Sequence, residues 1–269
     1  MIPAPFDYVQ AESAAHAIAL LAEHGDDAKL LAGGHSLLPM MKLRLAAPEV
    51  LIDIARVPEL AGIARDGDEL VIGAATRHAD LAGSALVREQ APLLAHAASL
   101  VGDPQIRHRG TIGGSLAHAD PAADLPMALV ALGGSVELLG PAGARVVAAD
   151  DFFTGFFETA LEPGELLTAV RVPCQPGAAW GYQKFVRRAN DWAIVGVAAI
   201  GGRIALANMG PVPLRARAAE DALAAGASTA EAARLAAEGT SPGEDIHADR
   251  AYREHLARVL TRRALDGEH

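Results

Sequence analysis

Cysteine is almost absent from this 269-residue chain, and its scarcity excludes several kinds of site. Cys174 is the sole cysteine. An intrachain disulfide therefore cannot form, and neither a thiolate-ligated iron–sulfur cluster nor a Cys-type zinc site can be built within the chain. If the protein passes electrons through iron–sulfur centres, those centres belong to another chain.

Basic clusters and long apolar runs are also missing. The net charge is −10 and no basic block occurs, whereas nucleic-acid-binding proteins usually present a basic face. No stretch of about 18 apolar residues predicts a membrane span. The first eight residues lack the basic and apolar regions of a signal peptide, so we expect a cytoplasmic protein.

Aromatic residues make up only 4% of the chain, whereas glycine and alanine are abundant. Much of the packing must therefore rely on small side chains and close backbone approach. The apolar pattern predicts an α+β architecture. Up to residue 173 we expect helices over 13–24, 78–84, 92–101 and 125–133, strands over 29–32, 50–54, 69–76, 135–139, 145–148 and 166–172, and an irregular stretch over 102–124.

A proline- and glycine-containing segment, 174–179, marks a plausible boundary before a second region. Three strands are expected there, over 181–188, 193–201 and 203–209, with Gly201-Gly202 as a tight hairpin between the last two. Ser228 and Glu231 have the spacing of a capping box. In the last helix, residues Tyr252, Leu256, Val259, Leu260 and Leu265 are expected near one face.

Two Gly-Gly segments carry the chemistry that the sequence suggests. The first is Ala32-Gly33-Gly34-His35-Ser36, directly after a strand, and the second is Thr111-Ile112-Gly113-Gly114-Ser115. Consecutive glycines let backbone amides approach an anion, and pyrophosphate is a common occupant of such sites. Neither segment fits a G-x-G-x-x-G or Walker pattern. A tight turn without a ligand is the alternative for either segment alone.

The residues around these segments resemble a known family. The blocks are LAGGHSLLPMMKLRL (31–45), RGTIGGSLAHADPAADLP (109–126), FFETALEPGELL (156–167) and KFVRRANDWAIV (184–195). They resemble the FAD-binding subunit of the molybdenum hydroxylases, the family of carbon-monoxide dehydrogenase and xanthine dehydrogenase. The resemblance covers essentially the whole chain. It implies a vanillyl-alcohol-oxidase-type FAD-binding fold over 1–173, with α+β subdomains over about 1–57 and 58–173. A small C-terminal domain over 178–269 would follow, with a three-stranded antiparallel sheet and helices.

The resemblance also implies a set of FAD-binding residues and no catalytic or metal-binding ones. His35, His108 and His118 lack the spacing of a metal site, and FAD is expected to bind without a covalent bond. The expected cofactor-binding residues are Leu30, Leu31, Ala32, Gly33, Gly34, His35, Ser36, Leu37, Val101, Thr111, Ile112, Gly113, Gly114, Ser115, Asp124, Leu167, Lys184 and Trp192.

Five of these residues have an alternative interpretation. The resemblance places Asp124 on a polar part of the cofactor, but its position also suits a helix N-cap. Val101 and Leu167 match positions beside the cofactor rings, or are plain core. Lys184 matches a lysine near the flavin, or is a surface lysine on an edge strand. Trp192 stands where relatives carry another aromatic residue beside the flavin, or is core.

The partners implied by the resemblance are a large molybdopterin subunit and a small iron–sulfur subunit. Electrons would cross two [2Fe–2S] clusters on the small subunit to reach FAD, and leave to NAD, a quinone or oxygen. The assembly would be a heterotrimer, usually doubled. Two alternatives remain at this point: a stand-alone FAD oxidase of the same fold, and a non-catalytic module that binds a phosphorylated ligand.

Overall fold

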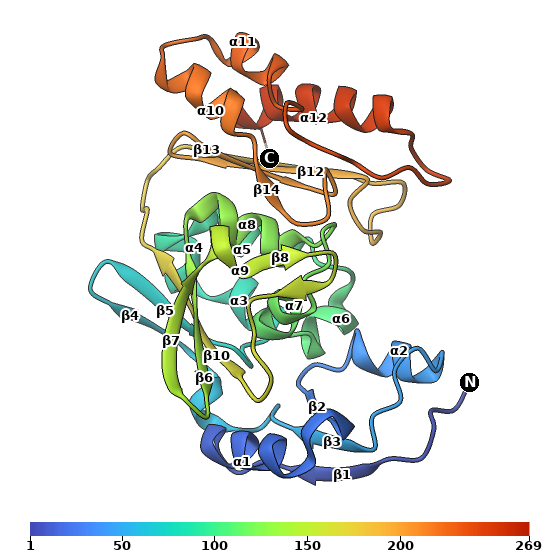
Figure 1. Ribbon diagram of the computed structural model, residues 1–269. Helices are drawn as coiled ribbons and strands as arrows, with labels where there is room; N and C mark the ends of the chain where they lie inside the picture. The colour runs from blue at the N-terminus through green and yellow to red at the C-terminus, as the bar shows by residue number, and fades with distance from the viewer. Residues whose placement is uncertain (269) are drawn as a thin grey trace.

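The computed structural model describes residues 1–268, in which three sheets follow one another along the chain, with a small two-stranded sheet beside the second (Figure 1). The N-terminal sheet lies at one end of the molecule, the middle sheet and its helices form the centre, and the C-terminal sheet is covered by the last helices. No helix within residues 1–268 combines the length and the apolar character that a membrane crossing needs.

The N-terminal unit is a three-stranded parallel sheet in the order β1-β3-β2. Its elements are β1 (Asp7–Gln10), α1 (Ala14–His24), a 3-10 turn (Gly25–Asp27), β2 (Ala28–Leu31), α2 (Leu37–Lys42) and β3 (Val50–Asp53). Ser13 caps α1 by accepting a hydrogen bond from the His16 amide. The first Gly-Gly segment joins β2 to α2, so the end of a strand paired with β3 fixes its position.

The middle unit is a five-stranded antiparallel sheet with helices on one face. The strand order is β4-β5-β10-β6-β7. The strands are β4 (Ile63–Asp66), β5 (Glu69–Gly73), β6 (Ser135–Gly140), β7 (Gly143–Ala148) and β10 (Leu166–Pro173), beside the small pair β8 (Phe153–Gly155) and β9 (Glu158–Thr159). The helices are α3 (His78–Gly83), α4 (Ala85–Gln90), α5 (Pro92–Ser99), α6 (Pro104–Arg109), α7 (Ile112–His118), α8 (Asp124–Leu132) and α9 (Ala149–Phe152), and a 3-10 turn covers Pro58–Leu60.

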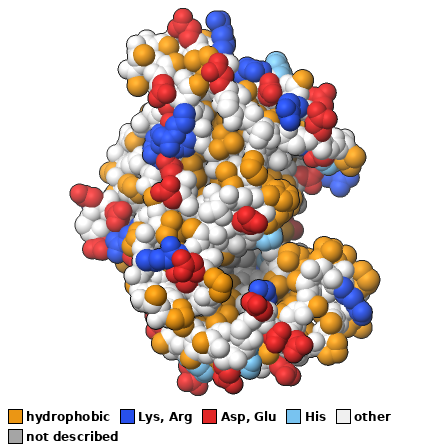
Figure 2. All heavy atoms as spheres, viewed as in Figure 1, with side chains coloured by type: hydrophobic (Ala, Val, Ile, Leu, Met, Phe, Trp, Pro, Cys, Tyr) orange, Lys and Arg blue, Asp and Glu red, His pale blue; other side chains and the backbone are white. Residues whose placement is uncertain are grey.

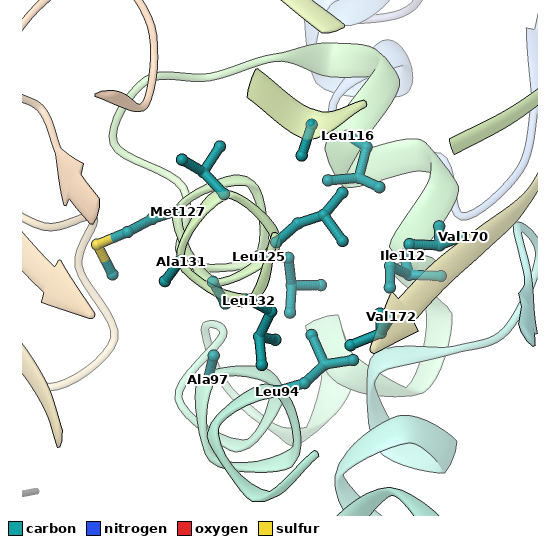
Figure 3. Close-up of a cluster of buried hydrophobic side chains, with 14 of the residues drawn as sticks. Leu94, Ala97, Ile112, Leu116, Leu125, Met127, Ala131, Leu132, Val170 and Val172 are labelled. Atoms are coloured by element: carbon teal, nitrogen blue, oxygen red, sulfur yellow. The ribbon is translucent and has the colours of Figure 1, made fainter. Parts of the chain in front are cut away.

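Helix α8 is the centre of the largest apolar cluster, and each of its nine residues is buried. Figure 3 shows Leu125 and Leu132 among the side chains of α5 and β10, while Met127 points the other way, toward the C-terminal sheet. A helix that is apolar all round must be covered on every side. The middle and C-terminal units therefore share α8 as common core.

The C-terminal unit is a four-stranded antiparallel sheet in the order β11-β12-β13-β14. Its elements are β11 (Trp180–Phe185), β12 (Val195–Ile200), β13 (Arg203–Ala207), β14 (Leu214–Arg215), α10 (Arg217–Ala224), α11 (Thr229–Arg234) and α12 (Arg250–Leu265). The three expected strands form, and a fourth joins at the edge. Because β14 has only two residues and follows Pro213, it is too short to show a periodic pattern in the sequence.

Two further sequence expectations differ from the structure. The stretch 102–124, expected to be irregular, contains α6 and α7, each capped by the residue before it, Asp103 and Thr111. In α12, Leu256 and Leu260 are buried as expected, but Tyr252 is 43% exposed and Arg253 takes the buried position beside it. Arg253 can be buried because its guanidinium donates hydrogen bonds to the Ile194 carbonyl and the Asp245 carboxylate.

Candidate functional site

A deep cleft separates the N-terminal unit from the rest of the molecule. Figure 2 shows the surface hollowed beside the lobe that carries α2. The pocket in this cleft has a volume of about 830 Å³, within the range of roughly 300–1,000 Å³ that is usual for ligand sites. Both Gly-Gly segments line it, so the fold brings together two stretches almost 80 positions apart in the sequence.

All but two of the eighteen predicted residues line this pocket. The lining includes residues 30–37, Val101, Thr111, Gly113, Gly114, Ser115, Asp124, Leu167 and Trp192. Ile112 is instead a core residue, 1% exposed. The other residue outside the lining is Lys184, whose side chain is turned to a buried partner. For Val101 and Leu167 the two interpretations combine, because both pack against the core and also face the pocket.

The first Gly-Gly segment presents free amides to the pocket. The backbone N–H groups of Gly33, Gly34, His35 and Ser36 donate to no acceptor within residues 1–268. Gly34 has a φ of +79°, a conformation that residues with a Cβ rarely adopt. Such a run of unpaired amides is a ready anion-binding surface.

The second Gly-Gly segment has no such free amides. The amide of Ile112 donates to the Thr76 carbonyl at 3.0 Å, and that of Gly113 donates to the Ala74 carbonyl at 2.9 Å. Those of Gly114 and Ser115 donate to the hydroxyl and carbonyl of Thr111. The sequence predicts that these amides cradle an anion, but each already has an acceptor within the chain. What this segment offers the pocket is the hydroxyls of Thr111 and Ser115.

Close packing explains why the second segment needs glycine. A Cβ on Gly113 would lie 2.6 Å from the Ala74 Cβ and 2.8 Å from the Ala74 carbonyl oxygen. The first segment packs against the chain just before the second, because a Cβ on Gly33 would lie 2.5 Å from the Arg109 carbonyl oxygen. Glycine therefore allows α7 to sit on the end of β5, and the first segment to rest on the chain before α7.

A buried polar cluster lies at the edge of the pocket where the C-terminal sheet meets α8. The Asp124 carboxylate accepts from the Tyr182 hydroxyl at 2.5 Å and from Lys184 Nζ at 2.8 Å. Lys184 also donates to the Leu100 carbonyl at 3.0 Å. Burial raises the pKa of Asp124, and Lys184 and Tyr182 oppose that rise. Burial also raises the pKa of Tyr182 well above its usual value.

The structure excludes the two alternative interpretations, a helix N-cap for Asp124 and a surface lysine for Lys184. Ala123 and not Asp124 occupies the N-cap position of α8, and Asp124 is its first residue. The Lys184 side chain is only 7% exposed, although β11 is an edge strand. Tyr182 was missed by the sequence analysis. Its spacing of two from Lys184 was the available signal, because alternate residues of a strand share a face.

Aromatic side chains stand at the mouth of the pocket. Trp192 lines the pocket and is 56% exposed, so it is not a core residue. In the turn before β9, Phe157 lies outside the lining but packs against the pocket-lining His118, with ring centroids 4.9 Å apart. The mouth thus offers flat apolar surface for a planar ligand.

Two titratable groups that the sequence analysis did not assign also line the pocket. His78 is 4% exposed, and burial together with the positive charges of His35 and Arg107 lowers its pKa to about 4. Asp120 has its pKa raised by burial. Within residues 1–268, no group of three or more His, Cys, Asp or Glu side chains could hold a metal ion.

Comparison with known proteins identifies the family. Residues 4–175 match the family described as "FAD binding domain in molybdopterin dehydrogenase", and residues 180–267 match "CO dehydrogenase flavoprotein C-terminal domain". The chain belongs to the flavin subunits of the molybdenum hydroxylases. This flavin subunit is 46% identical to the carbon monoxide dehydrogenase medium chain of Hydrogenophaga pseudoflava, over 99% of this chain and 98% of the relative.

Two further comparisons agree. The flavin subunit is 42% identical to the carbon monoxide dehydrogenase medium chain of Afipia carboxidovorans, over 99% of this chain and 97% of the relative. It superposes with a TM-score of 0.95 on a solved chain of the Hydrogenophaga pseudoflava carbon monoxide dehydrogenase. That pair is 48% identical, and the match covers 99% of this chain and 98% of the solved one. These matches confirm the fold class and the oxidoreductase family.

The geometry fits the cofactor of this family, FAD. A Gly-Gly segment with four free amides can receive a pyrophosphate. The pocket is long enough to be lined by α1 and β2 on one side and by Trp192 on another. Apolar walls at Val101 and Leu167 suit the flat rings of a dinucleotide.

Proposed function

We propose that this flavin subunit takes electrons from [2Fe–2S] clusters on a small partner chain and delivers them to an external acceptor. Bound FAD would supply a redox group that can exchange one or two electrons. The observation that carries the proposal is the pocket itself, which gathers sixteen of the eighteen predicted cofactor-binding residues. Substrate oxidation would occur at a molybdopterin centre on a large partner chain.

Within this site the two Gly-Gly segments have different proposed roles. The free amides of Gly33 to Ser36 would hold the pyrophosphate, and the only titratable side chain in the segment is His35. Thr111 and Ser115 would add hydroxyl donors from the opposite side. The cofactor would bind without a covalent bond, between the strand-to-helix turn of the first segment and the packed helix α7.

The remaining proposed roles concern the part of the pocket where the flavin ring would lie, beside Asp124 and Trp192. Asp124 lines the pocket while Tyr182 and Lys184 occupy both of its oxygens. We therefore assign Lys184 an indirect role, in which it neutralises the buried carboxylate beside the cofactor. Trp192 would cover the flavin from the C-terminal domain, because it is the aromatic residue that lines the pocket there.

The organisation of the assembly is part of the same proposal. We place the FAD-binding domain at residues 1–173, with subdomains at about 1–57 and 58–173, and the C-terminal domain at 178–269. The separate apolar clusters of the N-terminal and C-terminal units support this division. The holoenzyme would be a cytoplasmic heterohexamer, with NAD, a quinone or oxygen as acceptor.

Purification of the chain from its native host tests the proposal. We expect two further chains in equal amounts, iron and molybdenum in the preparation, and one FAD for each flavin subunit. Flavin absorbance at the visible bands should bleach when a substrate of the holoenzyme is added, and recover on addition of the acceptor. A chain that elutes alone, with FAD but without iron and molybdenum, would contradict the multisubunit assignment.

A further inference from the structure

A short stretch of chain carries Trp192 at the mouth of the pocket. Residues 187–190, before it, are exposed, and Ala193 and Ile194, directly after it, are buried. The exposed half is held by one backbone hydrogen bond, from the Asp191 amide to the Arg188 carbonyl at 3.0 Å. Whatever fixes Trp192 must therefore act on the residues that follow it.

Besides the backbone hydrogen bond from the Ile194 amide to the Phe185 carbonyl at 2.8 Å, two side chains from distant elements hold those residues. Asn208, just after β13, donates through Nδ2 to the carbonyls of Ala193 at 2.8 Å and Ile194 at 3.2 Å. Arg253, on α12, donates through Nη1 to the same Ile194 carbonyl. Arg253 is 2% exposed and is itself held by Asp245 at 2.6 Å. Burial of a guanidinium costs desolvation free energy. The position of Arg253 against the Ile194 carbonyl therefore calls for a structural role.

Asn208 is also tied to the pocket side of the molecule. Its backbone amide donates to the Pro121 carbonyl at 2.8 Å, next to the pocket-lining Asp120. Its φ is +60°, a left-handed conformation that asparagine tolerates better than most residues with a side chain. That conformation lets the backbone of Asn208 bond to the chain after α7. Its side chain then bonds to the two residues that follow Trp192.

We propose that Asn208, supported by Arg253, is the positioning residue that fixes Trp192 over the cofactor pocket. The inference rests on the proposed function only in that Trp192 covers FAD. The link between Asn208 and Trp192 is a property of the protein without cofactor. It gives a role to two polar residues of the C-terminal domain that lie outside the pocket lining.

The substitution Asn208→Gly tests this link in the full chain. Glycine accepts the positive φ and keeps the amide bond to Pro121, so the variant removes only the two side-chain hydrogen bonds. The second variant, Asn208→Asp, keeps the shape of the side chain and its tolerance of a positive φ. Its carboxylate cannot donate to the carbonyls of Ala193 and Ile194, so both hydrogen bonds are lost. The matched control is Asn190→Gly, which makes the same change at an exposed residue of the same segment.

Trp192 fluorescence is the readout, in a Trp180→Phe background that leaves a single tryptophan. Without FAD, we expect faster local anisotropy decay and greater quenching by acrylamide in both Asn208 variants than in Asn190→Gly. With FAD bound at the parent stoichiometry, we expect loss of part of the FAD-dependent quenching of Trp192. Parent-like Trp192 mobility in both Asn208 variants would overturn the proposal.

The two hypotheses fail in different ways. If FAD binds the parent without quenching Trp192, the placement of Trp192 over the cofactor is wrong. The mobility measured without FAD would still decide whether Asn208 positions the residue. A thermal melt of each variant, compared with that of the parent, separates local loosening from loss of the folded domain.

Discussion

The two Gly-Gly segments differ in what occupies their backbone amides. In the first, the amides of Gly33 to Ser36 have no acceptor among the described residues, whereas in the second the amides of Ile112 to Ser115 are all engaged. The same dipeptide therefore serves two physical purposes. One segment exposes backbone to a ligand, and the other lets a helix pack directly on the end of a strand.

This difference separates stability from cofactor binding. A change in the second segment should act on the folded chain first and on FAD only as a consequence. A change at Gly34 in the first segment, where an added Cβ meets only side-chain atoms, should act on FAD with a smaller effect on folding. The free energy of unfolding and the FAD dissociation constant, measured for the same variant, therefore distinguish the two purposes.

Gly113→Val should have the largest effect. Its side chain would overlap the backbone and Cβ of Ala74, and overpacking of this kind costs about 3 kcal/mol or more when backbone must move. We expect a large loss of stability in urea unfolding, with or without FAD. The control is Gly83→Val, where an added Cβ meets no atom within 4 Å. Near-normal stability with lost FAD binding would show that the amides, not the packing, require this glycine.

Acidification should destabilise the junction between the two segments through His78, whose ring lies against Gly110. Its pKa is about 4 in the folded chain against 6.5 when unfolded. Between these values the unfolded chain binds a proton that the folded chain does not. Stability should therefore fall by about 3 kcal/mol as pH drops from 6.5 toward 4, and no further below 4 on account of this group.

Urea unfolding at several pH values, compared with His78→Gln, measures this contribution. The variant should lose the part of the pH dependence that falls between pH 6.5 and 4, because glutamine does not titrate. An identical pH dependence in both proteins would assign the effect to other groups. A bound pyrophosphate nearby should also raise the pKa of His78, which would shift the transition to higher pH in the FAD-loaded chain.

Gly34→Ala should have a smaller effect on folding and a clear one on FAD. A left-handed alanine costs roughly 1–2 kcal/mol, while the added Cβ meets only side-chain atoms, those of Leu38 and Leu31. Relief of that strain would turn the amides of the first segment away from the pocket, so calorimetry should show weaker FAD binding. Gly34→Asn, which tolerates the conformation better, should recover part of the affinity. Unchanged affinity in Gly34→Ala would argue against these amides as the phosphate site.

Thr111→Val should have the smallest effect on stability. It removes the hydroxyl that accepts from the Gly114 amide, and loss of such a cap costs about 1 kcal/mol. Thr111→Ser keeps the hydroxyl and should behave like the parent in both thermal melting and FAD titration. Equal stability of the valine and serine variants would mean that the cap contributes nothing here.

The sequence could predict the members of the site better than their local roles. Gly113 and Gly33 were predicted from their dipeptides and context, and both line the pocket. The neighbours that exclude a side chain at these glycines could not be predicted, because Ala74 and Arg109 approach them only through tertiary packing. Likewise, the sequence predicted that both Asp124 and Lys184 belong to the site. That they bind each other depends on how β11 docks beside α8.

The fold shows a similar division. Strand β12 was predicted because burial on both faces leaves a continuous apolar run, and β10 because most of its eight residues are apolar. Short elements such as β14 and α7 were not, since two to seven residues carry too little periodicity. Arg253 shows the limit most clearly. Its burial depends on a carbonyl acceptor at Ile194, which no helical pattern predicts.

Hydrogen–deuterium exchange with and without FAD tests the central claim most directly. In the FAD-free chain, the amides of Gly33 to Ser36 should exchange quickly and those of Ile112 to Ser115 slowly. Addition of FAD should protect the first segment strongly and change the second little, because its amides already have acceptors. Fast exchange of the first segment in chain saturated with FAD would contradict the account, and would place the pyrophosphate elsewhere in the pocket.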